Sequence, residues 1–148
     1  LSHQPALAGI KHLNRLENVL ARAEWRDPEI REGLLLDLDG SAIGGTMSNL
    51  FIVENGTLVT PDLSRCGVAG VTRERVLDIA GLLNIPCRVE TLPLQRVLDA
   101  SEIFFVNSLI GLWPVAALAD KRWLAGAIGL KICAALAAAD AQAASSAL

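Results

Sequence analysis

Two short turn signals, Asp39-Gly40 and Asn55-Gly56, constrain the fold of this chain more than any other feature. Such dipeptides favour two-residue hairpin turns, because Gly, Asn and Asp accept the positive φ angles that these turns require. The short apolar segments around them predict strands over residues 34–37, 42–45, 49–53 and 57–60. The first half of the chain is therefore predicted to form an antiparallel meander.

The pattern changes after this meander, and helices begin to alternate with strands. Helical spacing predicts a helix over residues 71–83, closed by Asn84 and Pro86, and another over 12–25 that packs by one face. Further elements are expected as a strand over 88–92, a short helix over 93–100, a strand over 103–106, an extended piece at 113–115, an Ala-rich helix over about 122–141 and a frayed tail over 144–148. The prediction is an α+β fold in one domain, with a mixed, largely antiparallel sheet or pseudo-barrel and packed helices.

Charge and composition exclude several kinds of partner. The chain has 148 residues, is 52% hydrophobic, and carries a net charge of −3 without a run of like charges. This balance argues against nucleic acid, because proteins that bind its backbone carry basic patches. The apolar stretch over residues 124–139 is interrupted by Lys131 and is shorter than the roughly 20 residues of a membrane span, so a packed helix is expected there.

The cysteines and histidines give no metal or disulfide motif. The three cysteines, Cys66, Cys87 and Cys133, are widely spaced, and the two histidines, His3 and His12, lie near the start of the chain. We therefore expect no metal site, small buried thiols and a reducing, cytoplasmic compartment.

Three segments contain residue types that can serve a phosphorylated aldehyde cofactor. Lys11 lies between a Gly-containing segment and a helix, and a lysine amine can condense with an aldehyde, although most lysines are simply solvated. The glycine-containing segment 67–73 opens a helix, whose free N–H groups suit a phosphate, although many such loops are plain turns. Asn107 and Ser108 follow a predicted strand, where ligands often gather. Taken singly, each segment has an ordinary structural explanation.

Together, these segments resemble the fold-type IV pyridoxal-phosphate (PLP) enzymes, the class IV aminotransferase family. The stretch Ala8-Gly-Ile-Lys-His-Leu-Asn-Arg-Leu-Glu-Asn-Val-Leu20 resembles the cofactor-lysine segment of the bacterial aminodeoxychorismate lyases within that family. Thr46–Phe51, Gly67–Arg73, Val106–Ser108 and Trp113–Val115 match the broader family in order and spacing. The resemblance extends over roughly residues 6–115.

The resemblance implies a role for each matching residue. Lys11 matches the lysine that holds the cofactor covalently and then moves protons. Val71 and Thr72, with Gly70 before them, match the helix start whose backbone N–H groups hold the cofactor phosphate, and Ser108, next to Asn107, matches a further phosphate contact. The implied activity is conversion of 4-amino-4-deoxychorismate to 4-aminobenzoate and pyruvate, on the way to folate. The implied assembly is a homodimer.

Two departures from the family bear on that activity. Where the family has a glutamate that pairs with the pyridine nitrogen of PLP, this chain has Gly44, and Asp37 or Asp39 is a candidate substitute. The family's smaller N-terminal domain is also missing, so residues 1–148 correspond to the C-terminal, PLP-binding domain. Alternatives are a class IV aminotransferase acting on D-amino or branched-chain amino acids, or a fragment without activity.

Overall fold

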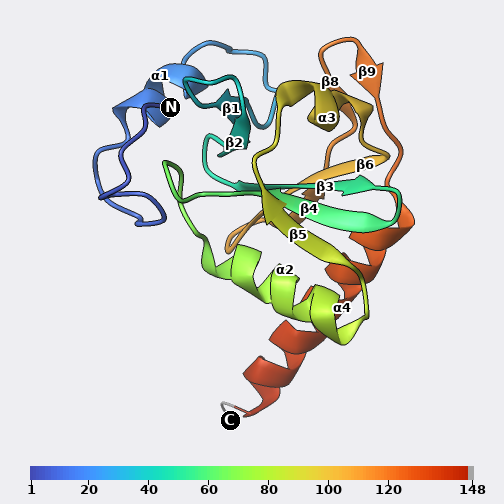
Figure 1. The fold of residues 1–148 in the computed structure, drawn as a ribbon. Coiled ribbons are helices and arrows are strands. Elements are labelled where there is room, and N and C mark those ends of the chain that lie inside the picture. Colours follow the sequence, from blue (N-terminus) through green and yellow to red (C-terminus); the bar gives the residue numbers. More distant parts are fainter. Residues whose placement is uncertain (147–148) are drawn as a thin grey trace.

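The antiparallel meander is present where the turn signals predict it. The computed structural model describes residues 1–146, and in it β1 (Leu34–Leu36), β2 (Ala42–Gly45), β3 (Asn49–Glu54) and β4 (Thr57–Pro61) pair in sequence order (Figure 1). Asn55 and Gly56 turn the chain between β3 and β4 with φ angles of 49° and 77°. These positive angles are the reason that Asn and Gly occupy this turn.

The second half completes a mixed sheet of seven strands. Helix α2 (Val71–Leu82) leads to β5 (Cys87–Glu90), which runs parallel to β4. After α3 (Leu94–Asp99), β6 (Glu102–Asn107) pairs antiparallel with β3, and β7 (Gly111–Pro114) pairs with β6. A small hairpin of β8 (Ala117–Leu118) and β9 (Lys121–Arg122) precedes α4 (Ala127–Ser146). The predicted α+β class, with a largely antiparallel sheet, is confirmed.

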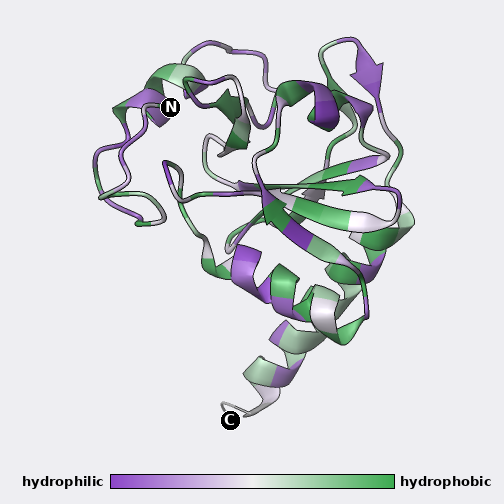
Figure 2. Cartoon of the chain, viewed as in Figure 1, coloured by the Kyte–Doolittle hydropathy of each residue, from purple (hydrophilic) through white to green (hydrophobic). Residues whose placement is uncertain are grey.

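Both faces of the sheet are covered. Helices α2 and α4 cover one face (Figure 1). On this face Phe51 and Phe104 stack with their ring centroids 5.3 Å apart. The opposite face packs Leu50, Ile52 and Phe105 against α3 and the segments around it. The central strands are accordingly apolar along most of their length (Figure 2). Successive side chains of β3 therefore lie on opposite faces of the sheet. This alternation fixes the face on which each side chain near the beginning of the strand lies.

The first helix differs from its prediction. Helix α1 (Leu16–Arg22) is shorter than the expected 12–25 and has no buried residue. Leu16, Val19 and Leu20, which form the apolar stripe, are 60–68% exposed. The expectation that this helix packs by one face is wrong for the described chain: helical spacing identified the apolar stripe, but no element of residues 1–146 covers it.

The Ala-rich helix also starts later than expected. Residues 121–122 pair in the β8–β9 hairpin, so α4 begins at Ala127, and it continues through Ser146 where a frayed tail was expected; residues 147 and 148 lie outside the described part. By length and composition, 127–145 is apolar enough to cross a membrane, and 17% of it is buried. Ile132 and Leu136 nevertheless belong to the core against α2 and the sheet, as expected for a packed helix.

The cysteines are only partly as expected. Cys66 is buried, whereas Cys87 and Cys133 are exposed. Cys87 lies on β5, whose residues are largely exposed, and Cys133 lies on the outer side of α4. The expectation of three buried thiols is therefore wrong for two of them, because β5 is exposed along most of its length and α4 leaves one side uncovered.

Candidate functional site

The Lys11 segment lies directly beside the loop that opens α2. Gly9 forms a parallel bridge with Val68: its N–H donates to the carbonyl of Gly67 at 3.1 Å, and its carbonyl accepts from the N–H of Ala69 at 3.0 Å. The register of this bridge brings Lys11 toward Gly70, the residue before the helix. Segments that are nearly sixty residues apart in the sequence are thus adjacent in the fold.

Arg15 fixes the backbone on both sides of Lys11. Its guanidinium donates to the carbonyl of Ile10 at 2.7 Å and to that of His12 at 3.2 Å. The side chain of Lys11 is itself exposed. Within the described residues, His12 Nδ1 is a buried polar atom without a hydrogen-bond partner. A rigid backbone, an accessible amine and an unpartnered buried nitrogen next to it suit a polar ligand at Lys11.

The start of α2 is shaped to receive an anion. Gly70 is the N-cap and forms no side-chain cap hydrogen bond, so the helix dipole and the N–H groups of Val71 and Thr72 are available to a ligand. The side chain of Thr72 is buried, and its backbone N–H is therefore the group it can offer. Gly67 has a φ of 91°, a conformation that glycine adopts readily. A phosphate fits this cradle by backbone contacts.

Asn49, at the start of β3, connects this loop to the sheet. Its Nδ2 donates to the carbonyl of Val68 at 2.7 Å, and a Cβ at Gly70 would lie 2.3 Å from its Oδ1. Asn49 also pairs with Val106 across β3 and β6. The sequence analysis noted Asn49 only as the first residue of a predicted strand and within a matching stretch. It missed that this buried side chain holds the loop before α2 against the strands.

Asn107 and Ser108 lie at the end of β6, as predicted, but they differ in what they offer. The Oδ1 of Asn107 accepts from the N–H groups of Leu109 and Ile110, both at 2.8 Å, and its Nδ2 donates to the carbonyl of Met47 at 3.1 Å. This side chain thus shapes the turn after β6. Ser108 is exposed, and its hydroxyl is accessible to a ligand. Of the two, Ser108 is the better candidate for a phosphate contact.

A carboxylate holds the turn between β2 and β3. Glu32 accepts hydrogen bonds from the N–H of Thr46 at 2.8 Å and from the hydroxyl of Ser48 at 2.6 Å. Asn18 of α1 donates to the carbonyl of Thr46 at 2.9 Å, and the neighbouring Met47 carbonyl is the acceptor for Asn107. This turn therefore joins the helix after Lys11 to the end of β6. Sequence reasoning missed Glu32, because nothing in its local sequence shows the turn that it reaches.

Neither Asp37 nor Asp39 is directed at Gly44, the position where the family has a glutamate. Gly44 is buried in β2 and pairs with Asn49, which places the two on the same face of the sheet. Asp37 binds its own hairpin and His3, and Asp39 pairs with Arg65 at 2.8 Å. The suggestion that either aspartate substitutes at this position has no support in the structure.

A separate cavity of about 460 Å³ opens on the other face of the sheet. Its walls include Leu50, Ile103 and Phe105 from the strands, and Trp113 and Arg31 lie at 6.0 Å in a cation–π contact beside it. None of the candidate cofactor residues lines this cavity. The candidate site is therefore the surface formed by the Lys11 segment, the α2 N-terminus and the end of β6.

Comparisons with known proteins show the family to which the chain belongs. The model of the family "Amino-transferase class IV" matches residues 1–118. The aminodeoxychorismate lyase of Vibrio harveyi is 41% identical over 118 residues, which are 80% of this chain and 44% of that protein. A probable branched-chain-amino-acid aminotransferase of Thermotoga maritima is 36% identical over 83% of this chain and 43% of its own length.

A solved structure is similar over nearly the whole chain. The crystal structure of 4-amino-4-deoxychorismate lyase from Pseudomonas aeruginosa superposes with a TM-score of 0.90 at 47% identity, covering 92% of this chain and 50% of that one. The chain thus spans about half the length of the relatives that it matches. The family match, the sequence identity and the shared fold agree, and the chain belongs to the class IV aminotransferase family.

Proposed function

We propose that the chain forms the C-terminal, cofactor-binding domain of a cytoplasmic, homodimeric PLP-dependent lyase that converts 4-amino-4-deoxychorismate to 4-aminobenzoate and pyruvate. The pairing of Gly9 with Val68 is the observation that supports this proposal most, because its register brings the Lys11 segment alongside the loop that leads into α2, a helix whose N-cap forms no side-chain hydrogen bond. The similarity to two lyases, at 41% and 47% identity, supports the substrate. Because the relatives are about twice as long, the proposal includes further parts of the protein that complete the substrate pocket.

Each candidate residue has a role in this reaction. When bound, PLP supplies an electron-poor conjugated ring that stabilises negative charge next to the substrate amine. The N–H groups of Val71 and Thr72 bind the phosphate, and the Ser108 hydroxyl adds a contact. The Lys11 amine takes the proton from the ring carbon that carries the substrate amine, and the bond to the enolpyruvyl oxygen breaks. The leaving group gains a proton, for which Lys11 is the available acid, and becomes pyruvate.

The assay that tests this function follows both products. The protein with added PLP is expected to release 4-aminobenzoate, detected by its fluorescence, and pyruvate in equal amounts. An aminotransferase is the alternative, favoured by the 36% identity to the Thermotoga maritima protein. It would exchange amino groups between D-amino or branched-chain amino acids and 2-oxo acids without forming 4-aminobenzoate. Absence of both activities in a protein that binds PLP would favour an inactive fragment.

Substitutions at Gly44 test how strongly lyase turnover depends on a carboxylate beside the pyridine nitrogen of PLP. Aromatisation of the product favours the elimination, so we expect Gly44→Glu to raise lyase turnover by less than about 3-fold, a change worth under about 0.7 kcal/mol. A Cβ at this position would lie 2.8 Å from the backbone carbonyl oxygen of Ser48, which also accepts from the N–H of Gly45. Both Gly44→Glu and Gly44→Ala should therefore lower the free energy of unfolding by about 1–3 kcal/mol, measured by urea denaturation.

The alanine variant separates the two effects, because it adds the same Cβ without the carboxylate. If the chain with Gly44 had no lyase activity and Gly44→Glu restored it, the idea that aromatisation replaces the carboxylate would be wrong.

A further inference from the structure

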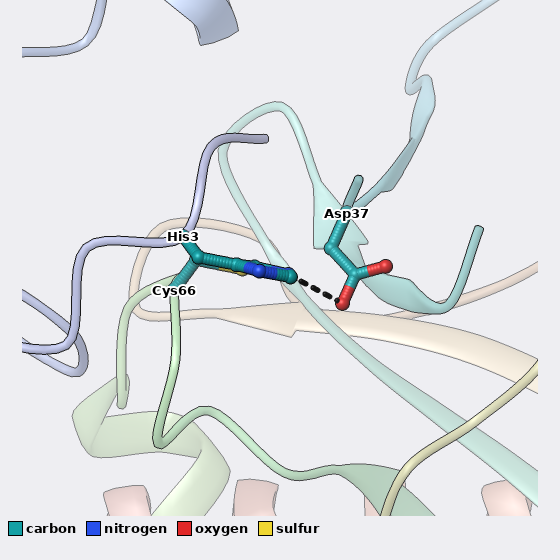
Figure 3. A group of neighbouring side chains, drawn as sticks. All are labelled: His3, Asp37 and Cys66. Atoms are coloured by element: carbon teal, nitrogen blue, oxygen red, sulfur yellow. Dashed lines mark hydrogen bonds and ion pairs between the residues drawn. The ribbon is translucent and has the colours of Figure 1, made fainter. Parts of the chain in front are cut away.

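Three side chains of the types that bind metal ions, from segments far apart in the sequence, meet beside the turn of the β1–β2 hairpin. His3 comes from the start of the chain, Asp37 follows β1, and Cys66 lies in the loop after β4. One donor atom of each lies within 4.8 Å of the other two. Figure 3 shows the imidazole ring of His3 edge-on in front of Cys66, with one end of the ring toward the carboxylate of Asp37. This cluster uses none of the residues assigned to the cofactor.

The carboxylate of Asp37 is held in one orientation. Its Oδ1 accepts from the backbone N–H groups of Asp39 at 3.0 Å and Ser41 at 2.8 Å. Its Oδ2 points into the cluster, 3.1 Å from Nε2 of His3. Burial alone would raise the pKa of Asp37, but the hydrogen bonds from Ser41, His3 and Asp39 outweigh it and lower the pKa. Asp37 is therefore a fixed anionic oxygen that points at an imidazole.

The thiol of Cys66 completes a mixed donor set. The residue is 5% exposed, and burial, followed by the charge of Asp37, raises the pKa of its thiol. The side chain of His3 is 17% exposed, which leaves an access route from solvent. Nitrogen, oxygen and sulfur donors in one cluster suit Zn²⁺, which accepts all three and imposes no geometry of its own through d electrons.

We propose that His3, Asp37 and Cys66 form a Zn²⁺ site, distinct from the cofactor site, that ties the start of the chain to the β1–β2 hairpin and the loop after β4. In a tetrahedral zinc site the N···O distance is about 3.3 Å and the distances to sulfur are about 3.6 Å. The N···O distance of 3.1 Å already agrees with this geometry, and the sulfur, within 4.8 Å, needs to move by roughly 1 Å at most. Asp39, whose Oδ2 is 4.0 Å from His3 Nε2, or a water supplies the fourth ligand.

Binding requires two protons to move. Nδ1 of His3 accepts from Arg65 at 2.7 Å, so Nε2 carries the imidazole proton in the metal-free cluster. When Zn²⁺ binds Nε2, this proton is carried by Nδ1 instead, so the hydrogen bond from Arg65 to Nδ1 breaks and Arg65 keeps its bond to Asp39, at 2.8 Å. The thiol proton leaves to solvent as the Zn–S bond forms. No oxidant or reductant is involved.

The test is a titration of the chelator-treated protein with Zn²⁺ in phosphate-free buffer, against a chromophoric chelator. We expect one tightly bound Zn²⁺ per chain, and we expect Cys66→Ser and His3→Ala each to weaken its binding at least about 100-fold. Cys133→Ser is the matched control, because it removes an exposed thiol on α4 and should leave the affinity unchanged. With Co²⁺ as the probe, the thiolate-to-metal absorption should be present in the control and absent from Cys66→Ser.

His3→Ala keeps the test valid if the buried Cys66→Ser variant fails to fold, since circular dichroism reports the fold of both. Failure of the wild-type protein to bind Zn²⁺ would show that the cluster serves only to hold its segments together by hydrogen bonds. Binding that survives His3→Ala but disappears in Cys133→Ser would assign it to a surface thiol, and either result overturns the proposal.

Discussion

Replacing Lys11 with arginine should abolish release of 4-aminobenzoate while leaving the fold intact. Arginine keeps the positive charge, but it has no neutral amine at working pH that can bond to an aldehyde or accept the substrate proton. Loss of a general base alone costs about 10²–10⁴-fold, so turnover should fall by at least about 1,000-fold once cofactor attachment is lost as well. Lys11 is exposed, and the free energy of unfolding should change by no more than about 0.5 kcal/mol.

The other two lysines provide matched controls for this experiment. Lys121 donates to the carbonyl of Leu98 and to Asp99, and Lys131 is exposed on α4, so Lys121→Arg and Lys131→Arg should retain activity. Borohydride reduction with PLP, followed by peptide mass mapping, should place the adduct on Lys11 in the wild type and in both controls. An adduct spread over Lys121 and Lys131, or full turnover by Lys11→Arg, would remove Lys11 from the mechanism.

The fold was largely predictable because its signals are local. The turn at Asn55-Gly56 needs positive φ, and alternation along β3 places Phe51 and Leu50 on opposite faces. The predictions that failed are those that depend on which elements of the chain pack or pair with one another. The stripe of Leu16 in α1 has the spacing of a packed helix, yet no described element covers it, and the spacing around residue 122 could not show that Lys121 and Arg122 pair with β8.

The candidate site was predictable only in part. Lys11 and Val71 were proposed from the sequence because the resemblance that assigns their roles rests on short local segments. The residues that join those segments were missed, since Glu32 acts on a turn fourteen residues away and Asn49 reaches a loop nineteen residues away. The same limit applies to His3 and Cys66, which are sixty-three positions apart and meet only through the hairpin between them. Long-range hydrogen bonds leave no pattern in one sequence.

The second large effect is expected from Gly70→Ala, because the added methyl group disturbs the loop at the start of α2 without straining the backbone. Gly70 has φ −76° and ψ 145°, which alanine adopts freely, but the added Cβ would lie 2.3 Å from Oδ1 of Asn49. Asn49 must then move and lose its 2.7 Å hydrogen bond to the carbonyl of Val68. Leaving these partly buried groups unpaired should lower the free energy of unfolding by about 1–3 kcal/mol.

The same displacement should weaken PLP binding, since the loop that carries the N–H groups of Val71 and Thr72 is anchored by that bond. We expect an affinity loss of about 10-fold, corresponding to about 1.4 kcal/mol, in a spectrophotometric PLP titration. Gly81→Ala is the matched control: it lies in the same helix with nothing within 4 Å of the added Cβ, so it should stabilise the protein by up to about 1 kcal/mol and leave PLP affinity unchanged. Equal PLP affinity in both variants would mean that the start of α2 does not hold the phosphate, because only Gly70→Ala disturbs that end of the helix.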